Sequence, residues 1–200
     1  HSEYYMFSDQ DDIWLPHKIE STYLKMLEME SVNPTTPILV HTDLAIADED
    51  GFVVKGSRYK YDKLYPDWLD KLNWFIVSYR ICGNTIMLND KAKAVALPFD
   101  DRIYMHDWWV VLMTLKMAGV VCNLKKSTIL YRQHRQQVVG LKSFNSIEKK
   151  EDGKISNFLI RLKGNFYQYS LLNEWVGISF SNYIFHKLVF WIYRLLEKRG

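Results

Sequence analysis

An apolar run ends at a group of carboxylates in the stretch Tyr4-Tyr5-Met6-Phe7-Ser8-Asp9-Gln10-Asp11-Asp12-Ile13-Trp14. Large apolar residues in a short run predict a buried strand, and an open α/β sheet binds its ligands where the strands end. Because side chains alternate along an extended segment, we expect Asp9 and Asp11 to point the same way and Asp12 to point the opposite way. The stretch therefore predicts an α/β fold with a site at this strand end.

The convergent pair of carboxylates is typical of a site for a hard divalent cation, Mg²⁺ or Mn²⁺. Such an ion takes one or two protein carboxylates and completes its shell with water and phosphate oxygens, which suits a nucleotide diphosphate. A competing interpretation is a polar loop in which the aspartates cap the next turn or helix. The spacing alone leaves both interpretations open.

Composition places the chain among single-domain proteins with an appendage. Its 200 residues with 48% hydrophobic content can bury one sizeable core. Residues 1–140 carry 16 positive and 18 negative charges, whereas residues 141–200 carry 10 and 5, so the basic excess lies in the tail. Cys82 and Cys122 lie far apart without CxxC spacing, which argues against a zinc site or a disulfide framework and favours a reducing cytoplasm.

Hydrophobic spacing predicts the elements that follow the acidic stretch. Pro16 suits the first position of a helix. The residues that recur on one face of this helix are Ile19, Tyr23, Met26 and Leu27. Strands are predicted at 38–40 and 44–47, followed by a turn at 48–51 and a returning strand at 52–54. Aromatic residues at helical spacing between 68 and 79 predict a core helix.

Two polar motifs lie beside predicted helices. Gly83-Asn84-Thr85 can bring backbone N–H groups close to an anion because glycine lacks Cβ, although glycine is also the usual helix C-cap. His106-Asp107-Trp108-Trp109 precedes an apolar helix over 110–117, which Gly119 ends in C-cap position. Asp107 thus lies where a helix begins, and a plain N-cap is one interpretation of it.

The stretch from Tyr5 to Pro16 resembles the DXD segment of family 2 glycosyltransferases of the rhamnosyltransferase-like kind. Later stretches follow in the order that this resemblance requires. They are His41-Thr42-Asp43-Leu44, Gly83-Asn84-Thr85, His106-Asp107-Trp108-Trp109 and Tyr131-Arg132-Gln133-His134. The chain departs from the family at Arg135-Gln136-Gln137, where relatives commonly have a Gly and an Asn.

The resemblance implies an α/β fold, an incomplete GT-A (nucleotide-diphospho-sugar transferase) mixed sheet that lacks its N-terminal nucleotide-binding half, plus a C-terminal helical tail. Because His1 stands only a few residues ahead of the DXD motif, we expect a fragment that binds donor weakly and is inactive by itself. The expected domains are the C-terminal part of the catalytic domain at 1–140, a linker at 141–156 and a basic-aromatic helical tail at 157–200.

The resemblance also implies a role for each candidate site residue. The cation ligands are Asp9, Asp11 and His134. The donor-binding residues are Asp12, Arg132, Arg135 and Gly83. The acceptor-binding residues are Asp43, Asn84, His106, Trp108 and Trp109. Asp107 is the catalytic base, a role compatible with a carboxylate held by helix N–H groups. Asp43 has an equally good interpretation as a satisfied polar residue at a strand end, and a lone His134 is more often a surface histidine.

The function implied is a metal-dependent, inverting transfer of a sugar, such as the deoxyhexose rhamnose, in polysaccharide biosynthesis. The donor is a nucleotide-diphosphate sugar, and the acceptor is a glycan or a lipid-linked saccharide. We expect a cytoplasmic protein at the inner face of the plasma membrane. The basic and aromatic residues at 56–67 have the composition of a single-stranded nucleic-acid platform but no motif, so we expect a surface loop and no nucleic-acid partner.

The tail contains a helical pattern at 180–196 in which 12 of 17 residues are apolar or aromatic. Its longest uninterrupted apolar run, Leu188 to Tyr193, is too short to span a bilayer. Aromatic and basic residues together predict peripheral membrane contact through 180–199, and packing against the catalytic core is the alternative.

Two rival functions remain. A strand-end DxD also serves phosphatases and phosphotransferases, with Asp9 as nucleophile and Asp11 as acid and base, and this chemistry requires a Thr or Ser and a Lys at later strand ends. A non-catalytic membrane-associated binding module is the other.

Overall fold

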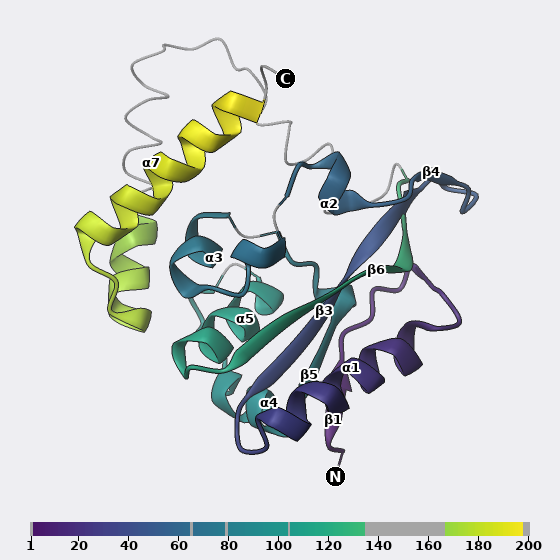
Figure 1. Cartoon of the computed structure of the whole chain (residues 1–200), viewed down its shortest axis with the longest axis horizontal. Coiled ribbons are helices and arrows are strands. Elements are labelled where there is room, and N and C mark those ends of the chain that lie inside the picture. The colour runs from purple at the N-terminus through teal and green to yellow at the C-terminus, as the bar shows by residue number, and fades with distance from the viewer. Residues whose placement is uncertain (1, 65, 79, 104, 135–166, 198–200) are drawn as a thin grey trace. The chain divides into compact units, whose positions relative to one another are not determined.

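The computed structural model describes residues 2–64, 66–78, 80–103, 105–134 and 167–197. The chain divides into two compact units, His1–Arg135 (unit 1) and Gln136–Gly200 (unit 2). Unit 1 is a mixed α/β structure built on a curled sheet, and the described part of unit 2, residues 167–197, is mainly helical (Figure 1). The predicted α/β class with C-terminal helices is therefore confirmed.

A mixed sheet of six strands forms the centre of the described part of unit 1. The strands are β1 (Tyr4–Met6), β2 (Ile13–Trp14), β3 (Ile38–Ala47), β4 (Val53–Lys55), β5 (Ile86–Asn89) and β6 (Val120–Arg132). Their order is β1-β5-β3-β6-β2, and β4 pairs with β3. The β3–β6 pair is parallel, whereas the other pairs are antiparallel.

Strand β3 is buried at every one of its ten positions. The sequence predicts separate strands at 38–40 and 44–47, but the polar residues between them continue the strand. Register shifts in the β3–β6 pairing accommodate this segment, and the Thr42 and Thr128 hydroxyls bond each other across it at 2.7 Å. Polar residues that satisfy one another inside the sheet therefore do not end the strand. Strand β6 likewise joins two short β-like runs of the sequence, at 120–124 and 128–131.

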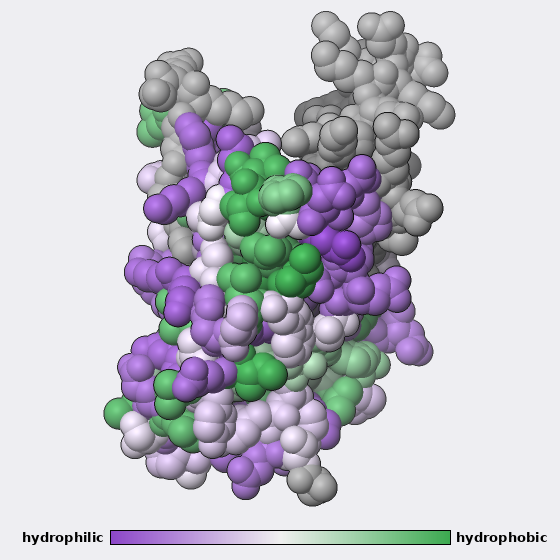
Figure 2. Space-filling view, turned by 90° about the vertical axis from the view of Figure 1, so that its right-hand side faces the viewer, coloured by the Kyte–Doolittle hydropathy of each residue, from purple (hydrophilic) through white to green (hydrophobic). Residues whose placement is uncertain are grey.

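The hairpin β3–β4 forms as predicted. Asp48 accepts hydrogen bonds from the backbone of Asp50 and Phe52, and Gly51 takes the left-handed conformation at φ +89°. The side chains of Phe52, Val53 and Val54 are exposed. Figure 2 views the side on which Figure 1 places β4, and it shows hydrophobic residues gathered between hydrophilic ones.

Helices cover the sheet on both faces. They are α1 (Lys18–Val32), α2 (Arg58–Tyr61), α3 (Leu72–Ser78), α4 (Asp90–Ala96) and α5 (His106–Lys116), with 3-10 turns η1 (Pro66–Trp68) and η2 (Gly83–Thr85). Met26 of α1 packs with Ile38, Val40 and Met87 in a fully buried cluster. Figure 1 shows α4 and α5 on the other side of β3.

The predicted buried face of α1 is wrong except at Met26. Ile19 is 57% exposed, and Tyr23 and Leu27 are exposed as well. The buried residues are Lys18, Thr22 and Met26. The helix also begins at Lys18, whereas Pro16 lies in the preceding turn. Two polar residues on the inner face explain the error, because a hydrophobic pattern cannot locate a face that buries a charge.

Helix α5 ends differently from the prediction. Ala118, and not Gly119, adopts positive φ (+53°) after the last helical turn. A Cβ at Gly119 would lie 2.6 Å from the Pro37 and Thr114 carbonyl oxygens. Glycine is therefore required there because the Pro37 backbone, directly before β3, and the last turn of α5 approach closely. The left-handed cap position falls one residue earlier.

Unit 2 contains a helical segment at 167–176 and helix α7 (Phe180–Glu197), which matches the predicted 180–196 pattern. Tyr183 of α7 is buried, and its ring lies 5.7 Å from that of Tyr169 between centroids. The predicted linker at 141–156 lies outside the described residues. None of the helices in the described parts of the chain has both the length and the apolar character of a membrane-spanning segment.

Candidate functional site

The acidic stretch forms a loop between β1 and β2, residues 7–12, with a turn at Gln10 and Asp11. We call this segment the acidic loop. The alternation predicted for an extended segment does not apply here, because residues 7–12 form a loop with a turn. Instead, each carboxylate takes the direction that its own contacts set. β2 pairs antiparallel with β6, and this places the loop before β2 beside the residues that follow β6.

Asp11 and His134 contact each other directly in this arrangement. The imidazole Nε2 of His134 lies 2.8 Å from the Asp11 carboxylate, and both side chains are partly exposed. The Arg132 side chain donates to the backbone carbonyl of Asp11. The fold therefore brings together two predicted cation ligands that lie 123 positions apart in the sequence.

Asp12 is bound from two sides. Its carboxylate accepts a hydrogen bond from the side-chain amide of Asn84 and another, at 3.3 Å, from the backbone N–H of Arg132. Burial raises the pKa of Asp12 to about 6, against the lowering effect of the Asn84 bond. The negative charges of Asp9 and Asp11 raise this pKa further.

Asp9 links the acidic loop electrostatically to the His106-Asp107 motif at the start of α5. Burial raises the pKa of Asp9, and the charges of Asp11 and Asp107 raise it further, whereas His106 lowers it. The ring of His106 lies edge-on to that of Phe7, with centroids 4.7 Å apart. The start of α5 and the acidic loop therefore belong to one electrostatic site.

Asp107 is buried in the first turn of α5, and Met105 occupies the N-cap position. One carboxylate oxygen accepts from its neighbour's N–H, that of Trp108, at 2.8 Å. The other accepts from the N–H of Gly83 at 2.9 Å. The plain N-cap interpretation is therefore wrong, and the carboxylate instead joins α5 to η2.

Gly83 permits this junction by its lack of a side chain. A Cβ at Gly83 would lie 3.2 Å from both the Asp107 Cβ and the His106 Nε2, tighter than ordinary contacts. The predicted approach of the Gly83 N–H to an anion is found, but the anion is the carboxylate of Asp107. The two motifs therefore form one structural unit.

Lys18 is a site residue that the sequence reasoning missed. Its side chain is fully buried, and its ammonium group donates to the backbone carbonyl of Asn84 at 2.8 Å. The same group lies 4.6 Å from the centroid of the Trp14 ring. The one signal in the sequence is the i, i+4, i+8 spacing of Lys18, Thr22 and Met26, which defines the buried face of α1.

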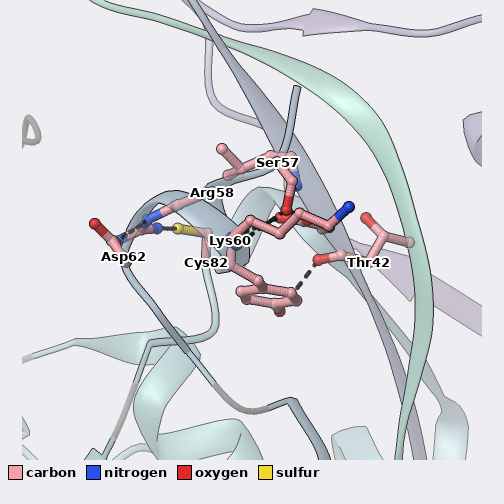
Figure 3. A network of polar contacts seen from close by, with 9 residues as sticks. Thr42, Ser57, Arg58, Lys60, Asp62 and Cys82 are labelled. Atoms are coloured by element: carbon pink, nitrogen blue, oxygen red, sulfur yellow. Dashed lines mark hydrogen bonds and ion pairs between the residues drawn. The ribbon is translucent and has the colours of Figure 1, made fainter. Parts of the chain in front are cut away.

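Asp43 lies in a separate hydrogen-bond network, in which both of its carboxylate oxygens accept hydrogen bonds. Its Oδ1 accepts from the N–H groups of Leu44 (2.8 Å) and Tyr59 (3.2 Å), and its Oδ2 accepts from the Ser57 hydroxyl. Figure 3 shows this region, in which the buried Arg58 bonds Asp62 at 3.2 Å and contacts the Cys82 sulfur. The network anchors α2 to β3, which favours the structural interpretation of Asp43.

The other predicted acceptor residues differ in exposure. Trp109 is buried, and its indole N–H donates to the Ala96 carbonyl at 2.8 Å, which makes it a core residue. Trp108 is half-buried and stacks on Phe75. His106 is exposed. Arg135, predicted to bind the donor, lies outside the described residues.

The side chains of Asp11 and His134 fit a divalent cation that is held by two protein ligands. Across the described ranges, no three His, Cys, Asp or Glu side chains come together closely enough to hold a metal ion by themselves. Asp11 and His134 supply an oxygen and a nitrogen ligand, and a cation of the Mg²⁺ or Mn²⁺ type takes its remaining ligands from water and phosphate. The Oδ1 atom of Asn84 is buried without a hydrogen-bond partner in the described part of the chain, so this side of the site has spare acceptor capacity.

Comparisons with known proteins add no identification, since no protein-family model and no curated protein matches this chain.

Proposed function

We propose that the chain is the DXD-containing part of a GT-A-type glycosyltransferase of family 2. It would transfer a sugar, such as a deoxyhexose, from a nucleotide diphosphate to a glycan or lipid-linked saccharide with inversion. The observation that carries the proposal is the meeting of four sequence motifs at the acidic loop. Asp11 contacts His134, Asp12 contacts Asn84, and Asp9 is within electrostatic reach of Asp107.

Asp11 and His134 are the residues that would hold a divalent cation, with Asp9 beside them. When bound, the cation supplies positive charge to the departing diphosphate. Arg132 lies at the same edge, where its guanidinium bonds the Asp11 carbonyl and can add charge close to the phosphates. Gly83 is better described as the partner of Asp107 than as a direct donor ligand.

Asp107 is suited to act as the base. Each of its oxygens accepts one backbone N–H bond, and each carboxylate oxygen has a second lone pair for a substrate hydroxyl. The proton would pass from the acceptor hydroxyl to Asp107 while the hydroxyl oxygen bonds the anomeric carbon. The bond from that carbon to the diphosphate oxygen breaks, and the nucleoside diphosphate leaves with the electron pair.

Replacing Asp107 with Asn in the intact protein tests this assignment. General-base catalysis contributes about 10²- to 10⁴-fold, so sugar transfer should fall by at least about 100-fold. The affinity for UDP or dTDP with Mn²⁺, measured by calorimetry, should remain close to that of the wild type because the Asn84 and Arg132 contacts are unchanged. Transfer at the wild-type rate would refute the assigned base.

The tail is proposed to contact a membrane surface, at the inner face of the plasma membrane. Helix α7 exposes large apolar side chains while Tyr183 is buried within unit 2. The exposed ones are Phe180, Phe185, Leu188, Trp191, Ile192, Leu195 and Leu196. Segment 180–199 carries four basic residues and one acidic residue, which favours anionic lipid. Lipid contact would bring the site to a lipid-linked acceptor.

Two assays separate the rival functions. Flotation on anionic liposomes without sugar transfer by the intact protein would favour the non-catalytic membrane module. Phosphate release from simple esters would favour the DxD phosphatase. Thr42 and Thr128 lie inside β3 and β6 with their hydroxyls bonded to each other, so neither supplies the strand-end hydroxyl that the phosphatase chemistry requires.

A further inference from the structure

A buried lysine beside the acidic loop has no place in the function proposed above. Lys18 is fully buried, and burial lowers its pKa to about 8, while the charge of Asp12 raises it. The ammonium group is therefore mainly protonated at neutral pH. Removing a charged group from water is costly unless charges and hydrogen bonds compensate it, so its retention here calls for a reason.

The contacts of Lys18 form a continuous path to the acidic loop. Its Nζ donates to the Asn84 carbonyl at 2.8 Å. The Asn84 side-chain amide donates to the Asp12 carboxylate, which also accepts the Arg132 N–H. Trp14 covers the ammonium group from the side of β2. The path therefore connects the start of α1, the η2 turn and the ends of β2 and β6.

We propose that Lys18 is a positioning residue of the donor site, whose ammonium group fixes the η2 turn through the Asn84 carbonyl and thereby holds Asp12 in place. Because η2 also supplies the Gly83 N–H to Asp107, the same contact sets the distance between the acidic loop and the base. This role of Lys18 rests on the donor site proposed above, and it adds to that site the residue that keeps Asp12 and η2 in position.

The structure offers a matched control on the same helix face. Thr22 is fully buried one turn further along α1, and its hydroxyl bonds the Lys18 carbonyl inside the helix at 2.6 Å. Thr22→Val removes a buried polar group without altering a contact to η2. Lys18→Met removes the charge and the Asn84 contact at similar volume.

Calorimetric titration of the intact protein with UDP and dTDP, each with Mn²⁺, tests the proposal well below the unfolding temperature. We expect Lys18→Met to weaken binding about tenfold or more and Thr22→Val to leave it unchanged, even where both lower thermal stability. Lys18→Gln replaces Lys18→Met should the latter fail to fold. Its uncharged side chain is one bond shorter and does not reach the Asn84 carbonyl, so the same loss is expected.

A double-mutant cycle with Asp12→Asn supplies a readout that a purely structural lysine would not change. If Lys18 acts through Asp12, its substitution should weaken binding much less in the Asp12→Asn background than in the wild type. Equal effects in both backgrounds, or unchanged affinity in Lys18→Met, would overturn the role of Lys18 alone. Absence of nucleotide binding by the wild type would overturn the donor site on which that role rests.

Discussion

Asp43 lies within the central strand β3 and Asp12 lies directly before β2, and the surroundings of the two carboxylates differ. Asp43 accepts hydrogen bonds from Leu44, Ser57 and Tyr59, all of which lie close to it in the sequence. Asp12 shares its loop with two other carboxylates, and its pKa is raised to about 6 by burial and by their charges. A carboxylate matched by local donors holds a fold together, whereas crowded carboxylates with raised pKa values favour a ligand that brings positive charge.

Removing the Asp11 carboxylate should have the largest effect in this comparison. Asp11→Ala deletes one of the two cation ligands, so Mn²⁺ should no longer strengthen nucleotide binding. We expect the affinity for UDP or dTDP with Mn²⁺ to fall about 100-fold, equivalent to about 2.7 kcal/mol. Calorimetric titrations with and without Mn²⁺ measure this. Unchanged metal dependence would show that the acidic loop is no more a cation site than Asp43 is.

Asp43→Ala should produce the reverse pattern. The N–H groups of Leu44 and Tyr59 would lose a buried acceptor, which costs about 2 kcal/mol of unfolding free energy. Urea denaturation measures this loss, and Mn²⁺-dependent nucleotide binding serves as the control that should stay constant. A fall in sugar transfer with unaltered stability would instead return Asp43 to the acceptor site.

The pH dependence of Asp12→Asn should show the smallest effect. The pKa of Asp12 is about 6 in the folded protein and 3.8 ordinarily, so the folded state binds the proton more tightly. The stability that this proton contributes is present below about pH 4 and is lost as the pH rises through 6. Asn cannot ionise, so the unfolding free energy of Asp12→Asn relative to the wild type should rise by about 1–2 kcal/mol from pH 4 to pH 8.

Urea denaturation of both proteins across that pH range gives the difference directly. Burial lowers the pKa of His41 to about 3, so the fold loses stability as the pH falls below 6.5. This effect is opposite in sign to that of Asp12. It is the same in the wild type and the variant, so it cancels in the difference between them. A difference that is flat with pH would place Asp12 among the ordinary, well-satisfied carboxylates.

The sequence predicted the positions of the longer elements, because strands and helices follow the local hydrophobic pattern. It missed α4, and the surface loop expected at 56–67 is wrong at α2, where Arg58 and Tyr59 are buried. The β3–β4 hairpin and α7 lie where the pattern places them. It failed where a polar group is buried. The hydroxyl pair of Thr42 and Thr128 continues a strand that the pattern interrupts, and Lys18 turns α1 so that Ile19 faces outward. Both failures concern groups whose partners lie far away in the chain.

By itself, the sequence determined that carboxylates follow β1 and that a glycine turn follows the helix predicted between 68 and 79. It also determined that an aspartate lies where α5 begins and that the tail is basic and aromatic. Only the tertiary structure decided which of these groups meet. Asp11 contacts His134 across 123 positions, and Asp12 contacts Asn84 across 72. The register of β2 on β6 sets the first contact, and the hydrogen bond from Lys18 to the Asn84 carbonyl holds η2 in place for the second. Hydrogen bonding between distant segments depends on the packed sheet and not on local spacing.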